Sequence, residues 1–332
     1  MKKLKISVLG AGSWGTAIST LLYDNGHEVT LWSHSKEEIL DIEKNHENKS
    51  KLPGVTLPDD INYSYDLEES VKSAEIIVLA VPSSAIRGMA AKVGGFTHKG
   101  QIVVTVSKGI EEGTLKTQSQ IAEDEIKNIP VVALSGPSHA EEVGRRLPTT
   151  LISASSDEEG AKIIQDAFMN NYVRVYTSDD VLGVELGGSL KNVIALAAGM
   201  IDGMGYGDNA KAALITRGIA EMSRLAIAMG AKAETLGGLS GIGDLIVTCE
   251  SVHSRNRKAG YLIGQGKTME QAMREVNMVV EGVYSAKAAL SLGKKYNVSL
   301  PIIEQVNHVL FDGKDTKEAV ADLMGRDKKS EY

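Results

Sequence analysis

Cysteine is almost absent from this 332-residue sequence, in which Cys249 is the single example. No intrachain disulfide can form, and nothing points to an oxidising compartment. No histidine or acidic residue is spaced near Cys249 in a known activating pattern, so we expect a small core residue rather than a nucleophile. The seven histidines show no HxxxH or other metal spacing. No metal site is therefore expected.

Long apolar runs and an excess of positive charge are also missing. In the second half, the longest purely apolar run (residues 193–201) has nine residues, against the roughly 20 that span a bilayer. The lysine-rich start leads into glycines at positions 10 and 12 and has no signal-peptide cleavage pattern. With 36 basic and 43 acidic residues the formal charge is −7, which disfavours nucleic acid as a partner. We expect a cytoplasmic protein without a membrane span, in which any anion site is local.

A glycine-rich turn follows the first expected strand, residues 5–9. Gly10, Gly12 and Gly15 form a GxGxxG pattern that opens a helix through about Asp24. In this position the glycines allow a tight turn and bring the backbone close to a pyrophosphate, whose charge then lies at the helix N-terminus. The pattern predicts a dinucleotide-binding fold.

The rest of the first half alternates apolar strands with helical segments. Near-continuous apolar strands are typical of a parallel sheet covered on both faces. Beyond about residue 189 only helical periodicity remains, and 332 residues exceed one ordinary core. We expect an α/β protein with a Rossmann-type, doubly wound, mostly parallel sheet in residues 1–189 and an all-α domain in residues 190–332. The expected strands are 5–9, 28–32, 75–81, 101–106, 131–134, 150–154 and 173–177.

The end of the second strand bears on the choice of cofactor. An acidic residue at this position usually binds the ribose 2′-hydroxyl of NAD, but the sequence reads Ser33, His34, Ser35 and Lys36. These side chains can accept a 2′-phosphate, so NADP(H) is preferred and NAD(H) stays possible. In the alternative interpretation the same residues cap a helix beginning near Ser35, with Lys36 in solvent.

Three further strands end in polar or Gly/Pro-rich segments, at residues 82–84, 107–109 and 135–140. Ligands in such folds gather beyond the carboxyl ends of the strands. We therefore expect the three segments to border one crevice, although each could be simple turn chemistry.

Lys191 lies where the α/β pattern gives way to helical periodicity. It stands close to the expected start of the apolar helix over residues 193–198, where desolvation would bring its pKa toward the range for proton transfer. The alternative is a lysine that snorkels from a buried helix.

A second polar cluster lies in the helical half, at residues 254–258. Its hydroxyl, guanidinium, amide and amine groups suit a phosphate at a helix start, although Ser254 could equally be a plain N-cap. Upstream, Asp244 follows two glycines and could orient the lysine, bind a substrate hydroxyl, or be a turn residue.

Taken in order, these motifs resemble those of the bacterial-type NAD(P)H-dependent glycerol-3-phosphate dehydrogenases over nearly the whole chain. The matching segments are 10–17 (GAGSWGTA), 107–109 (SKG), 135–140 (SGPSHA), 190–192 (LKN), 243–245 (GDL) with 248–249 (TC), 254–256 (SRN) and 280–282 (VEG). The resemblance implies reversible hydride transfer between sn-glycerol 3-phosphate and dihydroxyacetone phosphate, which supplies glycerophospholipid synthesis. It also implies a 6-phosphogluconate dehydrogenase-like C-terminal fold and a homodimer.

The resemblance also implies roles for single residues. Lys191 would exchange the proton at the C2 oxygen. The implied substrate-binding residues are Lys108, Gly136, Ser138, Lys191, Asp244, Ser254, Arg255 and Asn256. The implied cofactor-binding residues are Gly10, Gly12, Ser13, Trp14, Gly15, His34, Lys108, Ala140, Arg255, Val279 and Glu281.

One position departs from the family pattern, because Lys51 precedes Leu52-Pro53-Gly54 where the family commonly has an aromatic residue. We therefore do not carry over a stacking contact with the cofactor at this position, and a lysine could instead favour a phosphate. The alternatives are a related Lys-dependent hydroxyacid or 6-phosphogluconate-type dehydrogenase and a cofactor-sensing protein without turnover. The cluster at residues 254–256 argues against the first. A cofactor-sensing protein would have no evident function for Lys108, Lys191 and Asp244.

Overall fold

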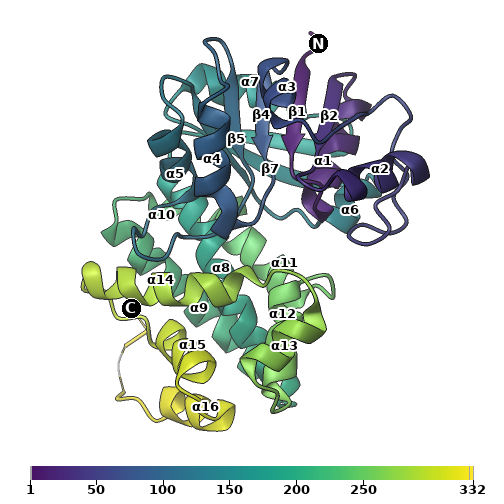
Figure 1. The fold of residues 1–332 in the computed structure, drawn as a ribbon. Coiled ribbons are helices and arrows are strands. Elements are labelled where there is room, and N and C mark those ends of the chain that lie inside the picture. The colour runs from purple at the N-terminus through teal and green to yellow at the C-terminus, as the bar shows by residue number, and fades with distance from the viewer. Residues whose placement is uncertain (1, 329, 332) are drawn as a thin grey trace.

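The first half of the chain forms an eight-stranded sheet with the order β3-β2-β1-β4-β5-β6-β7-β8 (Figure 1). The computed structural model describes residues 2–328, 330 and 331. All neighbouring strands are parallel except β6 and β7. The mostly parallel sheet expected from the sequence is confirmed. The strands are β1 Lys5–Leu9, β2 Glu28–Trp32, β3 Asn62–Ser64, β4 Ile76–Leu79, β5 Ile102–Thr105, β6 Val131–Ser135, β7 Thr149–Ala154 and β8 Val173–Ser178.

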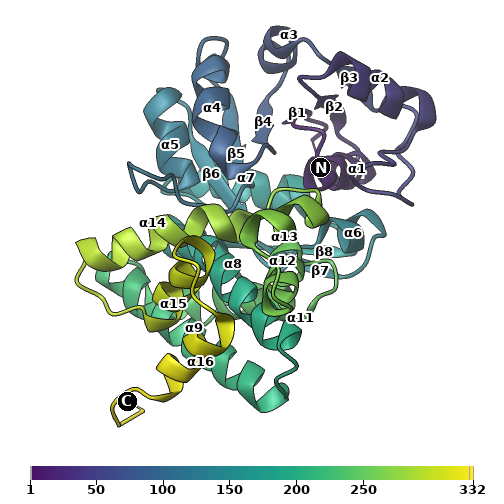
Figure 2. The same cartoon turned by 60° about the horizontal axis from the view of Figure 1, so that its bottom comes forward.

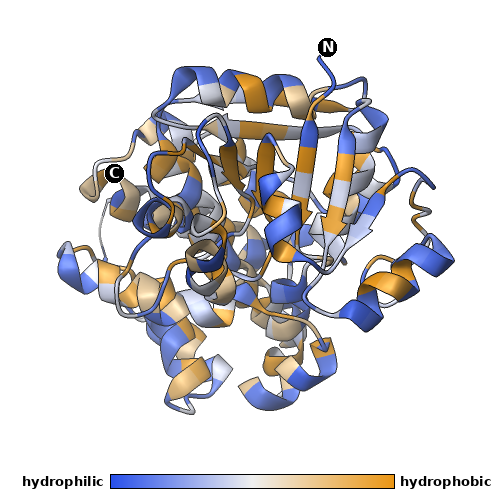
Figure 3. Ribbon diagram, turned by 45° about the horizontal axis from the view of Figure 1, so that its top comes forward, coloured by the Kyte–Doolittle hydropathy of each residue, from blue (hydrophilic) through white to orange (hydrophobic). Residues whose placement is uncertain are grey.

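Helices cover both faces of this sheet. Alternate residues of β4 belong to two separate apolar clusters: Ile76 and Val78 to one, Ile77 and Leu79 to the other. Because successive strand side chains point to opposite faces, the two clusters are the two covered faces of a doubly wound fold. In Figure 3 the strands accordingly carry mostly hydrophobic residues. The covering helices are α1 Ser13–Asp24, α2 Lys36–Asn45, α3 Leu67–Lys72, α4 Ile86–Gly94, α5 Gln118–Glu125, α6 Ala140–Gly144 and α7 Glu158–Phe168.

Strand β3 was not expected from the sequence. It has three residues, pairs with β2 alone, and contains no fully buried residue. A strand this short and polar carries no periodic signal, so its pairing with β2 can be found only in three dimensions.

In the described part of the chain, β8 is the last strand, and helices make up the second half as expected. Figure 2 shows α8 at the centre of these helices, where α9, α11, α12, α14 and α15 pack against it. The helices are α8 Val181–Gly203, α9 Asp208–Ala228, α10 Ala233–Leu236, α11 Asp244–Glu250, α12 Arg255–Gly264, α13 Met269–Val276, α14 Glu281–Lys295, α15 Pro301–Phe311 and α16 Thr316–Met324.

The position of Lys191 within helix α8 differs from the one expected. The helix begins at Val181, after Asp180 caps it by accepting a hydrogen bond from the Gly183 amide, so Lys191 lies at mid-helix and not near a helix start. The proposed domain division between residues 189 and 190 falls within this unbroken helix. By length and composition α8 could cross a membrane, but 89% of its apolar window is buried inside the protein. It is therefore the core helix of the second half.

Glycines allow α12 to pack unusually close to α8. A Cβ atom at Gly199 of α8 would lie 2.1 Å from the Arg257 carbonyl oxygen, and one at Gly260 of α12 would lie 2.0 Å from the Leu196 carbonyl oxygen. Gly203 and Gly264 repeat the arrangement one turn later on each helix. Since α12 begins at the polar cluster and α8 carries Lys191, this contact sets the distance between the two.

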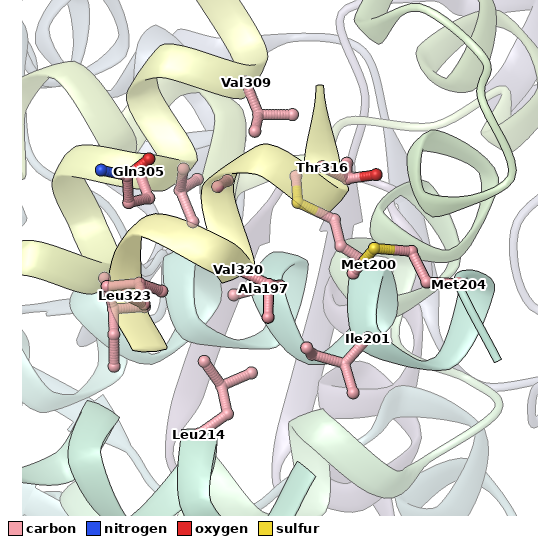
Figure 4. A pocket seen from close by; sticks show the side chains of 13 residues that line it. Ala197, Met200, Ile201, Met204, Leu214, Gln305, Val309, Thr316, Val320 and Leu323 are labelled. Atoms are coloured by element: carbon pink, nitrogen blue, oxygen red, sulfur yellow. The ribbon is translucent and has the colours of Figure 1, made fainter. Parts of the chain in front are cut away.

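A small apolar cavity of about 40 Å³ lies between α8, α9, α15 and α16 (Figure 4). Met200, Met204, Leu214 and Leu323 are among the side chains around it, and its lining is apolar apart from Gln305 and Thr316. This hollow is partly open to solvent, and none of its lining residues belongs to the polar cluster described next.

Candidate active site in the interdomain cleft

A cleft of about 540 Å³ lies where the carboxyl ends of the strands meet the helical half. The loops after β1, β4 and β5 border it on one side, as expected for a parallel sheet. Residues of α8, α11 and α12 and the segment 277–281 close the other side. This cleft gathers most of the residues singled out from the sequence.

Two lysines and one aspartate form a largely buried charged group beside the cleft. Lys191 Nζ donates to Asp244 Oδ1 at 2.7 Å and to Thr248 Oγ1 at 2.6 Å. Lys108 Nζ donates to Asp244 Oδ2 at 2.6 Å and to the Gly136 carbonyl oxygen at 2.8 Å. Asp244 is 1% exposed and Lys191 6% exposed. One carboxylate thus orients both ammonium groups.

The protonation states follow from burial and charge. Burial lowers the pKa of Lys191 to about 8; Asp244 opposes this shift, while Lys108 adds to it. For Asp244, burial raises the pKa, but the two lysines outweigh it and leave the pKa below its usual value. The aspartate therefore stays ionised, while Lys191 titrates near neutral pH. A lysine of this kind can both donate and accept a proton.

The start of α12 faces the same cleft. The Ser254 side chain caps the helix by accepting a hydrogen bond from the Arg257 amide at 3.2 Å, so the capping interpretation is confirmed, and Ser254 also lines the cleft. The Asn256 side chain is engaged, because it donates to Asn192 Oδ1 and accepts from the Gly282 amide, each at 2.9 Å. Arg255 lines the cleft and makes no ion pair within the described residues. A guanidinium at a helix N-terminus that is not held in an ion pair suits an anion.

The glycine-rich turn has the shape that a dinucleotide requires. Gly10 has φ +131°, and a Cβ at Gly15 would lie 1.9 Å from the Gly10 carbonyl oxygen. A Cβ at Gly12 would meet no protein atom within 4 Å, so this position faces the open cleft. No side chain caps α1 at Gly12. The free amides and the open space beside them fit a pyrophosphate.

The end of β2 holds a carboxylate that the sequence did not predict. Ser33 Oγ donates to Glu38 Oε2 at 2.5 Å, and Lys51 forms an ion pair with Glu38. All three line the cleft together with His34. Positions 33–36 contain no acidic residue, but the first turn of α2 brings the Glu38 carboxylate back beside Ser33.

Two neighbours of His34 do not take the role that was considered for them. Ser35 is the N-cap of α2 and accepts from the Glu38 amide. The Lys36 ammonium lies 4.7 Å from the centre of the Tyr65 ring and is not among the residues that line the cleft. The alternative interpretation, a capped helix start, holds for Ser35.

Most of the predicted site residues border the cleft itself. They are Gly10, Gly12, Ser13, Trp14, His34, Lys108, Ser138, Ala140, Lys191, Ser254, Arg255, Asn256, Val279 and Glu281. Three others lie behind its wall. Gly15 packs against Gly10, Gly136 supplies the carbonyl oxygen to Lys108, and Asp244 binds both lysines.

Several residues at the site were given no individual role from the sequence, among them Glu38, His139, Asn192 and Thr248. Thr248 follows Asp244 by four residues, a helical spacing that places both on one face toward Lys191. His139 Nε2 is buried without a hydrogen-bond partner in the described chain, and burial followed by the nearby Lys191 charge lowers the His139 pKa. Its polar neighbours become visible only once the strands are assembled.

Comparisons with known proteins agree over the whole chain. Two family models, described as the N-terminus and C-terminus of NAD-dependent glycerol-3-phosphate dehydrogenase, match residues 5–161 and 180–321. A protein of Agathobacter rectalis named glycerol-3-phosphate dehydrogenase [NAD(P)+] is 62% identical, over 99% of this chain and 98% of its own length. A Fusobacterium nucleatum protein of the same name is 57% identical over 99% and 98%. A crystal structure of glycerol-3-phosphate dehydrogenase from Coxiella burnetii is 35% identical with a TM-score of 0.94, over 98% of this chain and 99% of that one.

Proposed function

The chain belongs to the NAD-dependent glycerol-3-phosphate dehydrogenase family, and from this we propose that it interconverts sn-glycerol 3-phosphate and dihydroxyacetone phosphate as an NAD(P)-dependent oxidoreductase. One observation carries the proposal at the level of the site. Asp244 holds Lys191 and Lys108 beside a cleft that runs from the glycine-rich turn to the N-terminus of α12. A nucleotide site, a proton donor and an anion site thus share one cleft.

In the reducing direction, a nicotinamide bound in the cleft would supply a hydride to C2 of dihydroxyacetone phosphate. Negative charge then develops on the C2 oxygen, and the Lys191 ammonium stabilises this charge and donates a proton to the same oxygen. Hydride and proton together convert the ketone to the alcohol, and Lys191 regains its proton from solvent. Asp244 and Thr248 keep the ammonium in place through their bonds of 2.7 and 2.6 Å.

The phosphate of the substrate would lie at the start of α12. Arg255 offers a planar set of donors, and the amides of the first turn point the same way. Because the Asn256 side chain is engaged with Asn192 and Gly282, we assign to this residue a backbone contact and a positioning role. Lys108 and Ser138 would contact the middle of the substrate.

We further propose that NADPH is the preferred cofactor and that NADH is also accepted, with His34 beside the ribose 2′ position. The glycine-rich turn, Ala140, Val279 and Glu281 would hold the rest of the cofactor. The protein would be a homodimer located in the cytoplasm, and its product would supply glycerophospholipid synthesis. The division at residues 189 and 190 remains our proposal for the limits of the two functional halves.

The test is to mix the purified protein with NADPH and dihydroxyacetone phosphate, to follow nicotinamide oxidation and to identify the product. We expect oxidation with glycerol 3-phosphate as the product, and a slower reaction with NADH. A 6-phosphogluconate-type or hydroxyacid dehydrogenase would be inactive in this assay but active with a hydroxyacid. A cofactor-sensing protein would bind NADPH without turnover of either substrate.

A further inference from the structure

The ion pair between Glu38 and Lys51 lies at the end of the cleft where a dinucleotide places its adenosine ribose. Ser33 directly follows the last residue of β2, the position from which Rossmann-type folds recognise the ribose 2′ group. The Glu38 carboxylate accepts the Ser33 hydroxyl through one oxygen and pairs with Lys51 through the other. Burial raises the pKa of Glu38, but the bonds from Lys51 and Ser33 outweigh it and leave the pKa below its usual value, so the pair is charged.

Hydrogen bonds fix the backbone at both partners of this pair. Glu38 lies in the first turn of α2, where its amide is bonded to the Ser35 cap. The turn that carries Lys51 is tied to the glycine-rich turn by Asn48, whose side-chain amide donates to the Ala11 carbonyl oxygen and to Thr16 Oγ1, each at 2.9 Å. Asn48 Oδ1 also accepts from the Lys51 amide. The backbone of Lys51 is therefore held close to the glycine-rich turn, while its side chain keeps the freedom to change partner.

The two charges have opposite preferences for a cofactor. A carboxylate at this strand end accepts hydrogen bonds from a ribose 2′-hydroxyl and repels a 2′-phosphate, whereas an ammonium attracts the phosphate. The side chains are 19% and 38% exposed, so both ends of the pair can reach a ligand in the cleft. While Glu38 and Lys51 are paired, their charges neutralise each other. Neither NAD(H) nor NADP(H) then meets an unpaired charge at this end of the cleft.

We propose that Glu38 and Lys51 are the residues that determine specificity between NAD(H) and NADP(H), with each charge restraining the other. The proposal rests on the proposed function, since it requires the cleft to bind a dinucleotide. With NADP(H), the Lys51 ammonium leaves Glu38 for the 2′-phosphate. With NAD(H), Lys51 stays on Glu38, whose carboxylate accepts the ribose hydroxyl. The protein therefore accepts both cofactors, because Lys51 can exchange its ion pair with Glu38 for one with the 2′-phosphate.

Isothermal calorimetry with two nucleotide fragments tests this without turnover. Adenosine 2′,5′-bisphosphate and adenosine 5′-monophosphate differ only in the 2′-phosphate, so the ratio of their dissociation constants isolates that group. For Lys51→Met we expect the affinity for the bisphosphate to fall roughly tenfold or more relative to the monophosphate, the scale of a charged hydrogen bond. For Glu38→Gln we expect the ratio to shift the other way, toward the bisphosphate.

Lys49→Met is the matched control, because Lys49 is an exposed lysine two residues away that bonds to Asn45 and does not line the cleft. It should leave the ratio unchanged. If Lys51→Met and Glu38→Gln also keep the wild-type ratio while still binding both fragments, the proposal is overturned and the proposed function stands. If the wild-type protein binds neither fragment, the cofactor cleft itself is wrongly assigned and both fail.

Discussion

At the scale of single residues, the site depends on one carboxylate shared by two lysines. Removing Asp244 would leave two ammonium groups within one buried site, where like charges strongly disfavour each other. Removing either lysine leaves Asp244 paired with the other. The arrangement therefore keeps the aspartate ionised and makes the pKa of Lys191 sensitive to both neighbours.

Replacement of Lys191 by alanine should lower turnover by roughly 10²-fold or more, the scale for the loss of a positioned proton donor. Steady-state kinetics with dihydroxyacetone phosphate measures this. Lys211→Ala is a suitable control, because Lys211 is also a buried, ion-paired lysine but binds Asp202 and Glu250 outside the cleft. Near-normal turnover in Lys191→Ala would remove this residue from the mechanism.

The pH dependence of reduction should follow the pKa of Lys191, which is about 8. Only the ammonium form donates a proton, so kcat/KM for dihydroxyacetone phosphate should fall as the pH rises through this value. Asp244 raises the pKa of Lys191 and Lys108 lowers it. In pH–rate profiles, Asp244→Asn should therefore move the fall to lower pH, and Lys108→Met should move it to higher pH. Shifts of the same sign in both variants would contradict this electrostatic account.

Residue-level prediction from the sequence had a clear limit. Motif order identified Lys191, although its expected place near a helix start was wrong. The Ser33–Glu38–Lys51 group was missed, because its members meet only after α2 and the 48–52 turn fold back on the glycine-rich turn. The hydrogen bond from Asn256 to Asn192 was missed for the same reason. Contacts between distant segments leave no periodic signal along the chain.

At the scale of elements, the contact between α8 and α12 positions the start of α12 relative to Lys191. We expect Gly260→Ala to destabilise the protein by about 1–3 kcal/mol or more, because its Cβ would lie 2.0 Å from the Leu196 carbonyl oxygen and force the helices apart. Thermal or denaturant unfolding measures the loss. Gly88→Ala in α4 is the control, since its Cβ would meet no atom within 4 Å and alanine favours a helix. Equal stability of the two variants would show that the contact is not tight.

Glu221 of α9 provides a second test at this scale. It is 2% exposed and accepts the amides of Ile302 and Ile303 at the start of α15. Burial raises the pKa of Glu221 to about 7 from an ordinary 4.5. The folded state thus binds the proton more tightly than the unfolded state, so stability should fall as the pH rises from about 4.5 to about 7.

In the variant Glu221→Gln this part of the pH dependence should disappear, while Glu304→Gln, at an exposed position of α15, should retain it. Chemical denaturation across this pH range gives the comparison. An unchanged slope in Glu221→Gln would assign the titration to other groups.

At the scale of the whole molecule, the sequence predicted the sheet, the helical second half and the crevice at the strand ends. Buried strands such as β1 and β4 are apolar enough to be read directly. The extent of α8 could not be predicted in this way, because glycines at positions 183, 187 and 188 are typical of the end of a helix. In the folded protein Gly187 instead allows close packing, since a Cβ there would lie 2.5 Å from the Ser240 carbonyl oxygen.

Two carboxylates connect helices α8 and α14 to the sheet-bearing part of the chain: Glu185, which is buried, and Glu281, which is half-buried. Glu185 of α8 accepts the Ser119 amide at 2.8 Å, and Glu281 at the start of α14 accepts the Ser83 amide at 3.0 Å. In each case the serine hydroxyl also donates to the same carboxylate. These bonds hold α14 and α8, the helix that carries Lys191, against the sheet-bearing part of the chain, and hydride transfer needs such a fixed geometry.

The central claim is that hydride transfer to C2 takes place in this cleft with Lys191 as the proton donor. It is tested most directly with NADPH carrying deuterium at the transferable position of the nicotinamide, together with dihydroxyacetone phosphate. Mass spectrometry of the product should find glycerol 3-phosphate with one deuterium at C2, formed roughly 10²-fold more slowly by Lys191→Ala than by the wild-type protein. Product without deuterium at C2, or equal rates for the two proteins, would contradict the account.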